Sequence, residues 1–296
     1  MKCIPFILLM FACNIAMAQN LRIITYNIRL NIPSDGINAW PNRSNQVSAL
    51  LNVHQADIFG LQEAFIDQIK DIHAQLPNMA WVGVGRDDGK KAGEFSPIFY
   101  NSKKFKVLKK GWFWLSETPD KPGLGWDAAF NRICTWVLLE TDKKQRQFMV
   151  FNTHFDHKGV KARTESAKLI LRKIKELNKS NLPIILTGDF NLTPEQTPIA
   201  FLTSELKDSR SISKEKPYGP YGTLNNFDYN SPLKDRIDYI FVNDKIEVKQ
   251  YGVLTDSKDQ RYPSDHLPVF VSLELKDGKE NKSSGTRVFR DGTFLN

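Results

Sequence analysis

The sequence is poor in cysteine, and this shortage excludes several kinds of protein. Cysteine occurs three times in 296 residues, at Cys3, Cys13 and Cys134. The first two fall in a leader segment that we expect to be removed, so the mature chain would keep one thiol. A single thiol cannot form an internal disulfide and cannot build a cysteine-bound zinc site. Apolar residues flank Cys134, which predicts a buried structural position.

Long apolar runs are also missing. The amino terminus has a basic residue at Lys2, a short apolar run at 4–12 and a small-x-small site at 16–18. The run is too short to cross a membrane comfortably, and the pattern is typical of a secretory signal peptide. We expect a signal peptide over 1–18, export to the periplasm or the medium, and no transmembrane segment in the mature chain. Lipid attachment at Cys13 and a buried amino-terminal helix are the alternatives.

The sequence has no strong charge imbalance and no internal repeat. Its net charge is +8, with 25% charged and 41% hydrophobic residues, which is ordinary for a soluble globular protein. Such an excess of basic residues favours anionic substrates only mildly and does not by itself indicate nucleic-acid binding. No period of about 20 to 50 residues recurs, which argues against a solenoid.

Apolar runs rich in β-branched and aromatic residues recur along the chain and predict strands. They lie at 21–28, 57–62, 81–84, 96–100, 133–139, 148–153, 184–186, 237–242 and 269–275. Apolar residues at helical spacing predict one helix after Asn42 and another over 160–177. Strands mixed with covering helices favour a layered α/β domain, which we place at 20–275. The polar stretch 204–232 predicts a long loop that is either functional or disordered, and 276–296 predicts a polar carboxy-terminal tail.

Polar residues interrupt or end the predicted strands at several places, which needs a reason because a buried unpaired polar group is costly. They are Tyr26-Asn27, Gln62-Glu63, Thr153-His154, Gly188-Asp189-Phe190-Asn191 and Ser264-Asp265-His266. A single group of this kind is more often a loop cap or a packed residue. Together they supply oxygen ligands for a hard cation and two histidines that can exchange protons with a phosphate. These are the parts that metal-assisted phosphoryl transfer requires.

These motifs, in this order and with Arg236-Ile237-Asp238-Tyr239 before the last one, resemble those of the endonuclease/exonuclease/phosphatase family. That family includes deoxyribonuclease I, abasic-site endonucleases, neutral sphingomyelinases, inositol-phosphate phosphatases and deadenylases. The resemblance runs from about residue 21 to residue 275. Within it, the segments 85–95 and 112–119 resemble a branch of exported bacterial members of the family. It implies an α/β fold with four layers: two mostly antiparallel sheets packed face to face, with helices outside.

The resemblance also implies a cofactor, which would be Mg²⁺ or Mn²⁺. Glu63 would be the main metal ligand, Asn27 would lie beside it, and Asp265 would make a second metal contact. The sequence has no HExxH motif and the mature chain would have no cysteine pair, so a structural zinc site is disfavoured.

Five further motif residues receive catalytic roles from the same resemblance. Asp189 would orient or deprotonate the attacking water, and Asn191 would hold the phosphate. His266 would act as general base or bind a phosphoryl oxygen, with Asp238 orienting it. His154 would bind the phosphate, stabilise the transition state or assist the leaving group.

Two other residues rest on looser motifs. Glu94 is similar to the carboxylate that pairs with the first catalytic histidine in deoxyribonuclease-like members. Arg132 looks like the phosphate-binding arginine of the family. The alternatives are a glutamate that caps a loop and an arginine that lies on the surface.

The sequence therefore predicts in-line attack of water on phosphorus, without a covalent enzyme intermediate. We expect a phosphodiesterase or nuclease-type enzyme, a monomer, acting on nucleic acid or a nucleotide. The alternative is a phosphomonoesterase or phospholipase C-type enzyme that acts on a sugar phosphate or lipid headgroup. A third interpretation is a non-catalytic binding protein on the same scaffold.

Some aromatic residues would either stack on a base or sugar or pack in the core. These are Trp112, Trp114, Trp126 and Phe227.

Overall fold

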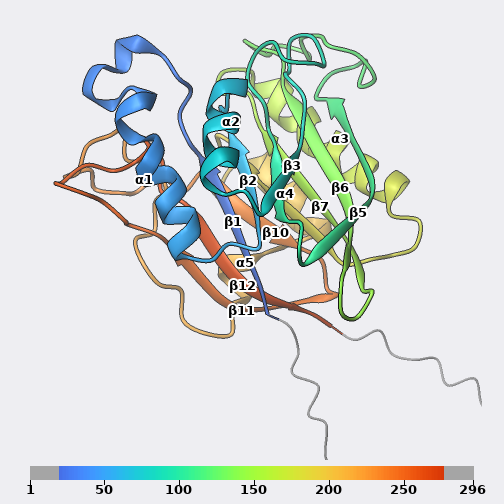
Figure 1. Cartoon of the computed structure of the whole chain (residues 1–296). Helices are drawn as coiled ribbons and strands as arrows, with labels where there is room; N and C mark the ends of the chain where they lie inside the picture. The colour runs from blue at the N-terminus through green and yellow to red at the C-terminus, as the bar shows by residue number, and fades with distance from the viewer. Residues whose placement is uncertain (1–19, 277–296) are drawn as a thin grey trace, which may run out of the picture.

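The computed structural model of the chain describes residues 20–276, and it has two six-stranded sheets that pack face to face (Figure 1). The expected signal peptide over 1–18 and all but the first residue of the expected tail lie outside the described residues. Within residues 20–276, no helix is both long enough and apolar enough to cross a membrane.

The first sheet has one parallel pair, and its other neighbouring strands are antiparallel. Its strand order is β11 (Ile246–Val253), β12 (Val269–Leu275), β1 (Leu21–Asn27), β2 (Ile58–Gln62), β4 (Ile98–Asn101) and β3 (Met79–Val82). The parallel pair is β1 with β2. Helices α1 (Trp40–Val53) and α2 (Ile66–Gln75) pack on its outer face, and the 3-10 helix η1 (Pro33–Asn38) precedes α1.

The second sheet repeats this plan. Its strand order is β5 (Phe105–Trp114), β6 (Ile133–Thr141), β7 (Gln147–His154), β8 (Ile184–Asp189), β10 (Asp238–Val242) and β9 (Lys207–Asp208). The parallel pair is β7 with β8. Helices α3 (Val160–Leu177) and α4 (Thr197–Glu205) cover its outer face, and the short α5 (Ser209–Ile212) follows β9.

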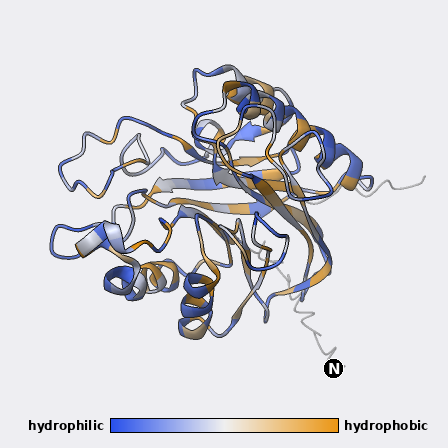
Figure 2. Cartoon of the chain, turned by 90° about the horizontal axis from the view of Figure 1, so that it is seen from above, coloured by the Kyte–Doolittle hydropathy of each residue, from blue (hydrophilic) through white to orange (hydrophobic). Residues whose placement is uncertain are grey.

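Three apolar clusters fill the spaces between the layers. One contains residues of both sheets and lies between them, one joins the first sheet to α1 and α2, and one joins the second sheet to α3 and α4. The layers are seen edge-on in Figure 2, where apolar residues face inward along the helices and strands. Cys134 is fully buried in the third cluster, as expected. The predicted four-layered sandwich is therefore confirmed.

Several elements were not predicted, among them β5, β11, α2 and α4. β5 carries lysines at positions 106, 109 and 110 and forms the edge of its sheet, where charged side chains discourage pairing with another chain. β11 lies at the edge of the other sheet and also alternates polar with apolar residues. α2 and α4 are short helices of ten and nine residues. The stretch 204–232 is not wholly a loop, because it includes β9 and α5.

A buried polar network joins the two sheets near one end. The Asn152 side chain donates hydrogen bonds to the carbonyl oxygens of Leu61 (2.8 Å) and Pro97 (2.9 Å) in the first half of the chain. Its Oδ1 atom accepts from Gln62 Nε2 (2.7 Å) and Thr187 Oγ1 (3.0 Å). Gly60 leaves room for this network, since a β-carbon there would overlap the Asn152 amide and the Thr187 hydroxyl.

We expect Gly60→Ala to lower the free energy of unfolding by about 1–3 kcal/mol, because the added methyl group must displace buried, hydrogen-bonded groups. Chemical denaturation of the purified variant measures this change. Gly123→Ala is the matched control, since the nearest atom to its new β-carbon would be Thr118 Oγ1 at 3.8 Å. Equal stability of the two variants would contradict the tight approach of the sheets at Gly60.

Candidate active site

Strand register brings three of the predicted residues side by side at one end of the second sheet. His154 is the last residue of β7 and pairs with Asp189 at the end of the parallel strand β8. Asp238 begins the antiparallel strand β10 and also pairs with Asp189. The Asp189 carboxylate therefore lies between a histidine and a second carboxylate, all of them buried.

The first sheet contributes residues from the ends of β1 and β2. Asn27 ends β1, and its Nδ2 atom donates to Asp189 Oδ2 (2.9 Å) across the gap between the sheets. The same amide nitrogen donates to Glu63 Oε1 (3.0 Å), and Glu63 directly follows β2. Asn27 thus connects the predicted metal ligand to the predicted base.

Glu63 has a left-handed backbone conformation, with a φ of 59°. A non-glycine residue at such an angle stores local strain, and strain of this kind concentrates at functional sites. The second carboxylate oxygen of Glu63 accepts a hydrogen bond from the Leu30 backbone nitrogen (3.2 Å). The backbone thereby turns the carboxylate toward Asn27.

His266 lies on the other side of Asp189. Its Nδ1 atom is 2.9 Å from Asp238 Oδ2, and its Nε2 atom is 3.8 Å from Asp189 Oδ2. Burial would lower the pKa of His266, but the carboxylates of Asp238, Asp189 and Asp265 outweigh burial and raise it well above the ordinary histidine value. His266 is therefore a buried imidazolium held by carboxylates.

His154 has the opposite protonation state. Burial, together with the positive charges of Arg132 and Arg86, lowers its pKa well below the ordinary value, so the ring is neutral. The Asn191 side-chain amide is 3.0 Å from Nε2 of His154 and can only donate there, which leaves the proton on Nδ1. Nδ1 lies 3.8 Å from Glu94 Oε2. The site thus holds one charged and one neutral histidine.

Asp189 is the meeting point of these groups. Its Oδ2 atom is 3.5 Å from His154 Nε2, in addition to its contacts with Asn27 and His266. Its Oδ1 atom accepts from the Asn191 backbone nitrogen (2.9 Å). Burial and the neighbouring Asp238 carboxylate raise the pKa of Asp189 to about 7, which makes it a carboxylate with a strong affinity for a proton.

The two residues with looser motifs also lie near His154. Arg86 Nη1 donates to Glu94 Oε2 (2.6 Å), so Glu94 is an ion-pair partner rather than a loop cap. Arg132 is buried rather than on the surface, with its Nε atom 3.5 Å from Asp156 Oδ2. Among the described residues, its Nη1 atom has no hydrogen-bond partner.

The oxygen atoms near Glu63 suit a divalent cation. The Asp265 pKa is raised by burial and also by the negative charge of Glu63, so the two carboxylates repel each other in the absence of a counter-charge. A hard cation between them would relieve this repulsion. Asp189, Asp238 and His266 also place ligand atoms within 4.8 Å of one another. We favour the Glu63 side, because a nitrogen of His266 is already hydrogen-bonded to Asp238.

A buried arginine that the sequence analysis missed holds the segments carrying Asn27 and Asp265. Arg43 of α1 donates to the backbone oxygens of Ile28, Arg29 and Pro263, the last at 3.2 Å. Ser264 Oγ donates to the Asn27 backbone oxygen (2.7 Å) and strengthens the same connection. Arginines in helical patterns are usually exposed, so this role cannot be read from the residue pattern.

The stretch 204–232, which the sequence predicts as a long loop, supports the site through its backbone. Thr223 Oγ1 accepts from the backbone nitrogens of Ile237 (3.1 Å) and Asp238 (3.2 Å). The Asn225 side chain donates to the Ser264 backbone oxygen (3.0 Å). This part of the loop therefore fixes both the Asp238 and the His266 segments.

The four aromatic residues left open by the sequence differ in position. Trp114 is buried, and its indole nitrogen donates to the Arg86 backbone oxygen (2.6 Å). Trp112, two residues earlier on the same strand, is 38% exposed. Trp126 packs partly against the core, and the Phe227 ring lies 5.6 Å from the Arg43 guanidinium.

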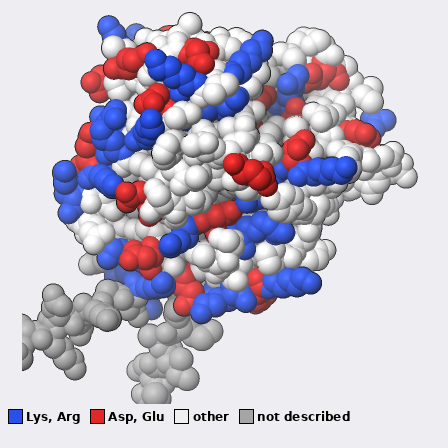
Figure 3. All heavy atoms as spheres, turned by 180° about the vertical axis from the view of Figure 1, so that it is seen from behind, with Lys and Arg blue, Asp and Glu red and all other residues white. Residues whose placement is uncertain are grey.

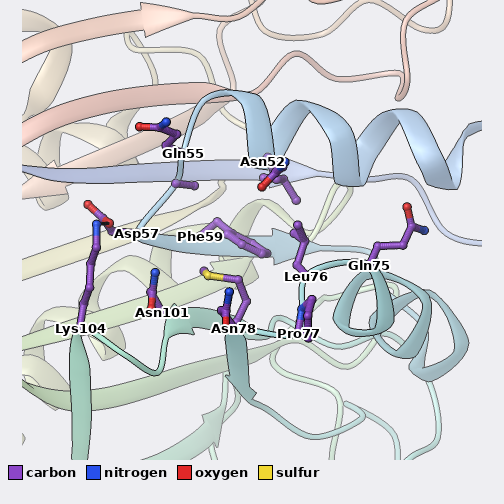
Figure 4. Close-up of a pocket in the computed structure, with 13 residues that line it drawn as sticks. Asn52, Gln55, Asp57, Phe59, Gln75, Leu76, Pro77, Asn78, Asn101 and Lys104 are labelled. Carbon is purple, nitrogen blue, oxygen red and sulfur yellow. Dashed lines mark hydrogen bonds and ion pairs between the residues drawn. The ribbon is translucent and has the colours of Figure 1, made fainter.

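The molecule also has features away from this site. A pocket of about 270 Å³ lies between the carboxyl ends of α1 and α2, with Asp57, Phe59 and Lys104 in its lining (Figure 4). Asp57 precedes β2 whereas Glu63 follows it, so this pocket is at the opposite end of the strand from the site. On the face seen in Figure 3, positive and negative side chains are interspersed, and the net charge is not concentrated there.

Comparison with known proteins places this geometry among phosphoester hydrolases. The model of the Endonuclease/Exonuclease/phosphatase family matches residues 24–266. A Bacteroides thetaiotaomicron structure described as a mannosyl-6-phosphatase is 45% identical, with a TM-score of 0.83 over 86% of this chain and 100% of that one. A second structure from that organism, described as an endonuclease/exonuclease/phosphatase family protein, is 44% identical, with a TM-score of 0.84 over 88% of this chain and 99% of that one.

The curated relatives are more distant. An RNA exonuclease of Saccharomyces cerevisiae is 22% identical over 180 residues, which are 49% of this chain and 49% of the relative. The matches to the first curated relatives span between 30% and 59% of their length.

The loop carboxylate of Asp156 generates a testable prediction. Burial would raise the pKa of Asp156, but the backbone nitrogens of Gly159, Lys158 and Ala129 and the Arg132 charge outweigh burial and lower it to about 2. A depressed folded-state pKa stabilises the protein above the unfolded-state value of about 3.9, and this contribution is lost as pH falls toward 2.

We expect Asp156→Asn to lower the free energy of unfolding at pH 7 by about 1–3 kcal/mol, because its amide cannot accept at both positions. Denaturation from pH 7 down to pH 3 should show the gap between wild type and variant narrowing below about pH 4. Asp120→Asn, at an exposed position, is the control. A gap that is independent of pH would contradict a charged Asp156.

Proposed function

Because the chain belongs to the endonuclease/exonuclease/phosphatase family, whose members hydrolyse phosphoester bonds, we propose that it is a metal-dependent hydrolase of sugar phosphate monoesters. The observation that carries the proposal is the convergence of Asn27, His154 and His266 on one carboxylate oxygen of Asp189. A water molecule that donates a proton to this oxygen would be in contact with groups suited to holding a phosphate. The arrangement suits attack by water on phosphorus.

In this proposal the chain's own residues divide the work by their charge. Asp189 accepts the proton of the attacking water, because its environment raises its proton affinity. The His266 imidazolium donates to a phosphoryl oxygen, while Asp238 fixes the ring through Nδ1. Neutral His154 keeps its proton on Nδ1, which is the donor that the ring can offer to a phosphoryl oxygen, while the Asn191 amide fixes the ring through Nε2. Fixed donors aimed at a developing negative charge are an effective form of catalysis.

Glu63, Asn27 and Asp265 would hold Mg²⁺ or Mn²⁺ in this proposal. When bound, the cation supplies positive charge that offsets the charge of the phosphoryl oxygens. Arg29 Nη1 lies 3.9 Å from Asp265 Oδ2 and its main ion-pair partner is Asp35 at 3.0 Å, so Arg29 leaves Asp265 open to a cation.

The choice of a sugar monoester rests on the 45% identical structure described as a mannosyl-6-phosphatase. The sequence alone favours a phosphodiester substrate, with a phosphate monoester as the alternative. We now place the phosphate monoester first. Phosphodiester cleavage stays the second candidate, since a curated relative is described as an RNA exonuclease, at 22% identity. We further propose export by the signal peptide over 1–18, which suits an enzyme that acts on phosphorylated sugars outside the cytoplasm.

A substrate panel tests the proposed reaction. With Mg²⁺ present, we expect kcat/KM for mannose 6-phosphate to exceed that for bis-p-nitrophenyl phosphate and for single-stranded RNA. Asp189→Asn should lower kcat by about 10²- to 10⁴-fold, because the amide cannot accept a proton, while its thermal unfolding curve stays cooperative. A preference for either diester would replace the monoester proposal. Near-normal turnover by Asp189→Asn would remove the role of Asp189.

A metal titration tests the proposed ligands. Chelation with EDTA should abolish activity, and added Mg²⁺ or Mn²⁺ should restore it. Glu63→Gln should raise the Mg²⁺ concentration needed for half-maximal activity by about 10- to 100-fold or more, because the cation loses a charged ligand. Glu165→Gln, on the outer helix α3, is the matched control. An unchanged metal requirement in Glu63→Gln would exclude Glu63 as a ligand.

A further inference from the structure

Two aromatic rings outside the catalytic cluster stack on each other beside it. The rings of Phe130 and His157 have centroids 5.8 Å apart and are inclined by 21°. Phe130 is 50% exposed and His157 is exposed, although neither belongs to a motif with an assigned role. A single exposed apolar side chain is ordinary on a protein surface, and Phe130 stands out by its stacking on His157 and its contact with the Arg86 guanidinium.

The pair is held in place by one buried carboxylate. Asp156 Oδ2 accepts from the backbone nitrogens of Ala129 (3.1 Å) and Phe130 (3.3 Å). Its Oδ1 atom accepts from the backbone nitrogens of Lys158 (2.9 Å) and Gly159 (2.7 Å). Asp156 therefore joins the loop before β6 to the loop after β7. The backbone segments that carry the two rings are therefore held together by Asp156, independently of any contact between the rings.

A short series of contacts places the pair next to His154. The Arg86 guanidinium lies 5.1 Å from the centre of the Phe130 ring and donates to Glu94, which is beside His154 Nδ1. His157 follows His154 by three residues, and its Nδ1 atom lies 3.3 Å from Nη2 of Arg132, whose charge also acts on His154. The pair thus lies at the rim of the cluster that would hold the phosphate.

The polar groups around the rings suit hydroxyl groups. Arg132 Nη2 lies 3.3 Å from His157 Nδ1 and can only donate there, so the ring proton is on Nε2, which is free to serve as a donor. Asn131, next to Phe130, donates to Asp87 Oδ1 (3.2 Å), and the exposed Asp87 carboxylate is an acceptor on the same rim. A hydroxyl group can use both kinds of partner.

We propose that Phe130 and His157 form the platform that binds the sugar ring of the substrate, and that they set the preference for a sugar over other phosphate monoesters. The inference rests on the proposed function. The C–H groups on one face of a pyranose ring are apolar and pack on an aromatic ring, while its hydroxyl groups reach the polar groups at the rim. With the phosphate at His154, the sugar carbon chain extends over Phe130.

Paired substitutions at Phe130 test the platform. We expect Phe130→Leu to raise KM for mannose 6-phosphate by about 3- to 10-fold, with kcat within twofold, since one aromatic contact is lost. For glycerol 2-phosphate, which has no ring, kcat/KM should stay within twofold. Phe130→Tyr keeps the ring and should behave as wild type. Tyr218→Leu is the control, since Tyr218 is exposed and bridges to Gly252 of β11, at the opposite edge of the first sheet from β3 and the loop that follows it.

Paired substitutions at His157 separate its ring from its hydrogen bond. His157→Phe keeps a ring without the acceptor for Arg132, and His157→Gln keeps a polar group without the ring. The proposal expects the larger rise in KM for mannose 6-phosphate with His157→Gln. Equal effects of Phe130→Leu on both substrates, or no effect on either, would overturn the platform while leaving the hydrolase intact. An effect confined to nucleoside monophosphates would assign the platform to a base instead.

The substrates that the wild-type protein hydrolyses distinguish failure of the proposed function from failure of the platform alone. If it hydrolyses no sugar monoester but cleaves RNA or bis-p-nitrophenyl phosphate, the proposed function fails and the sugar platform fails with it. If it hydrolyses mannose 6-phosphate and the Phe130 and His157 variants show no selective rise in KM, only the platform fails.

Discussion

The whole site depends on one hydrogen bond between the two sheets, from the Asn27 amide to the Asp189 carboxylate. Asn27 belongs to the first sheet and Asp189 to the second, so the bond has its length only while the sheets keep their separation. Apolar packing alone would tolerate small shifts between the layers, because it is not directional. Asn152 and Gln62 remove that freedom with directional bonds, and Gly60 lets the layers approach. The distances within the candidate site therefore depend on how closely the two sheets pack.

The opposite charges of the two histidines follow from their surroundings. His266 faces Asp238 and Asp189, which favour its protonated form, whereas His154 faces Arg132 and Arg86, which favour its neutral form. Both rings are buried, so these neighbours act through a medium that screens little. Two identical side chains can therefore take different tasks in one reaction. Asp189 lies between them and interacts with both.

Sequence reasoning found the site motifs because polar residues stood where buried strands ended, as at Asn27 and Asp189. It found strands with two buried faces, such as β1 and β7, and missed β5, whose lysines make an edge strand look like a loop. It could not find Arg43 or Asp156, because a buried charge and a surface charge look alike until their partners are known. Asp156 has one signal in the sequence, its place directly after the motif Thr153-His154-Phe155. The assigned roles of the motif residues stay predictions.

The left-handed backbone at Glu63 has a consequence for how this protein could evolve. Arg29 and Asn191 share that conformation, with φ values of 54° and 50°, so three segments that line the site keep angles that most side chains avoid. Local strain at these residues and the mutual repulsion of Glu63 and Asp265 both lower the free energy of unfolding. Replacement of Glu63 with glycine would remove both the backbone strain and the repulsion, so it should raise the free energy of unfolding while it abolishes the proposed activity. In lineages that no longer need the proposed activity, we expect substitutions at Glu63 to accumulate and to give a more stable, inactive protein with the same fold.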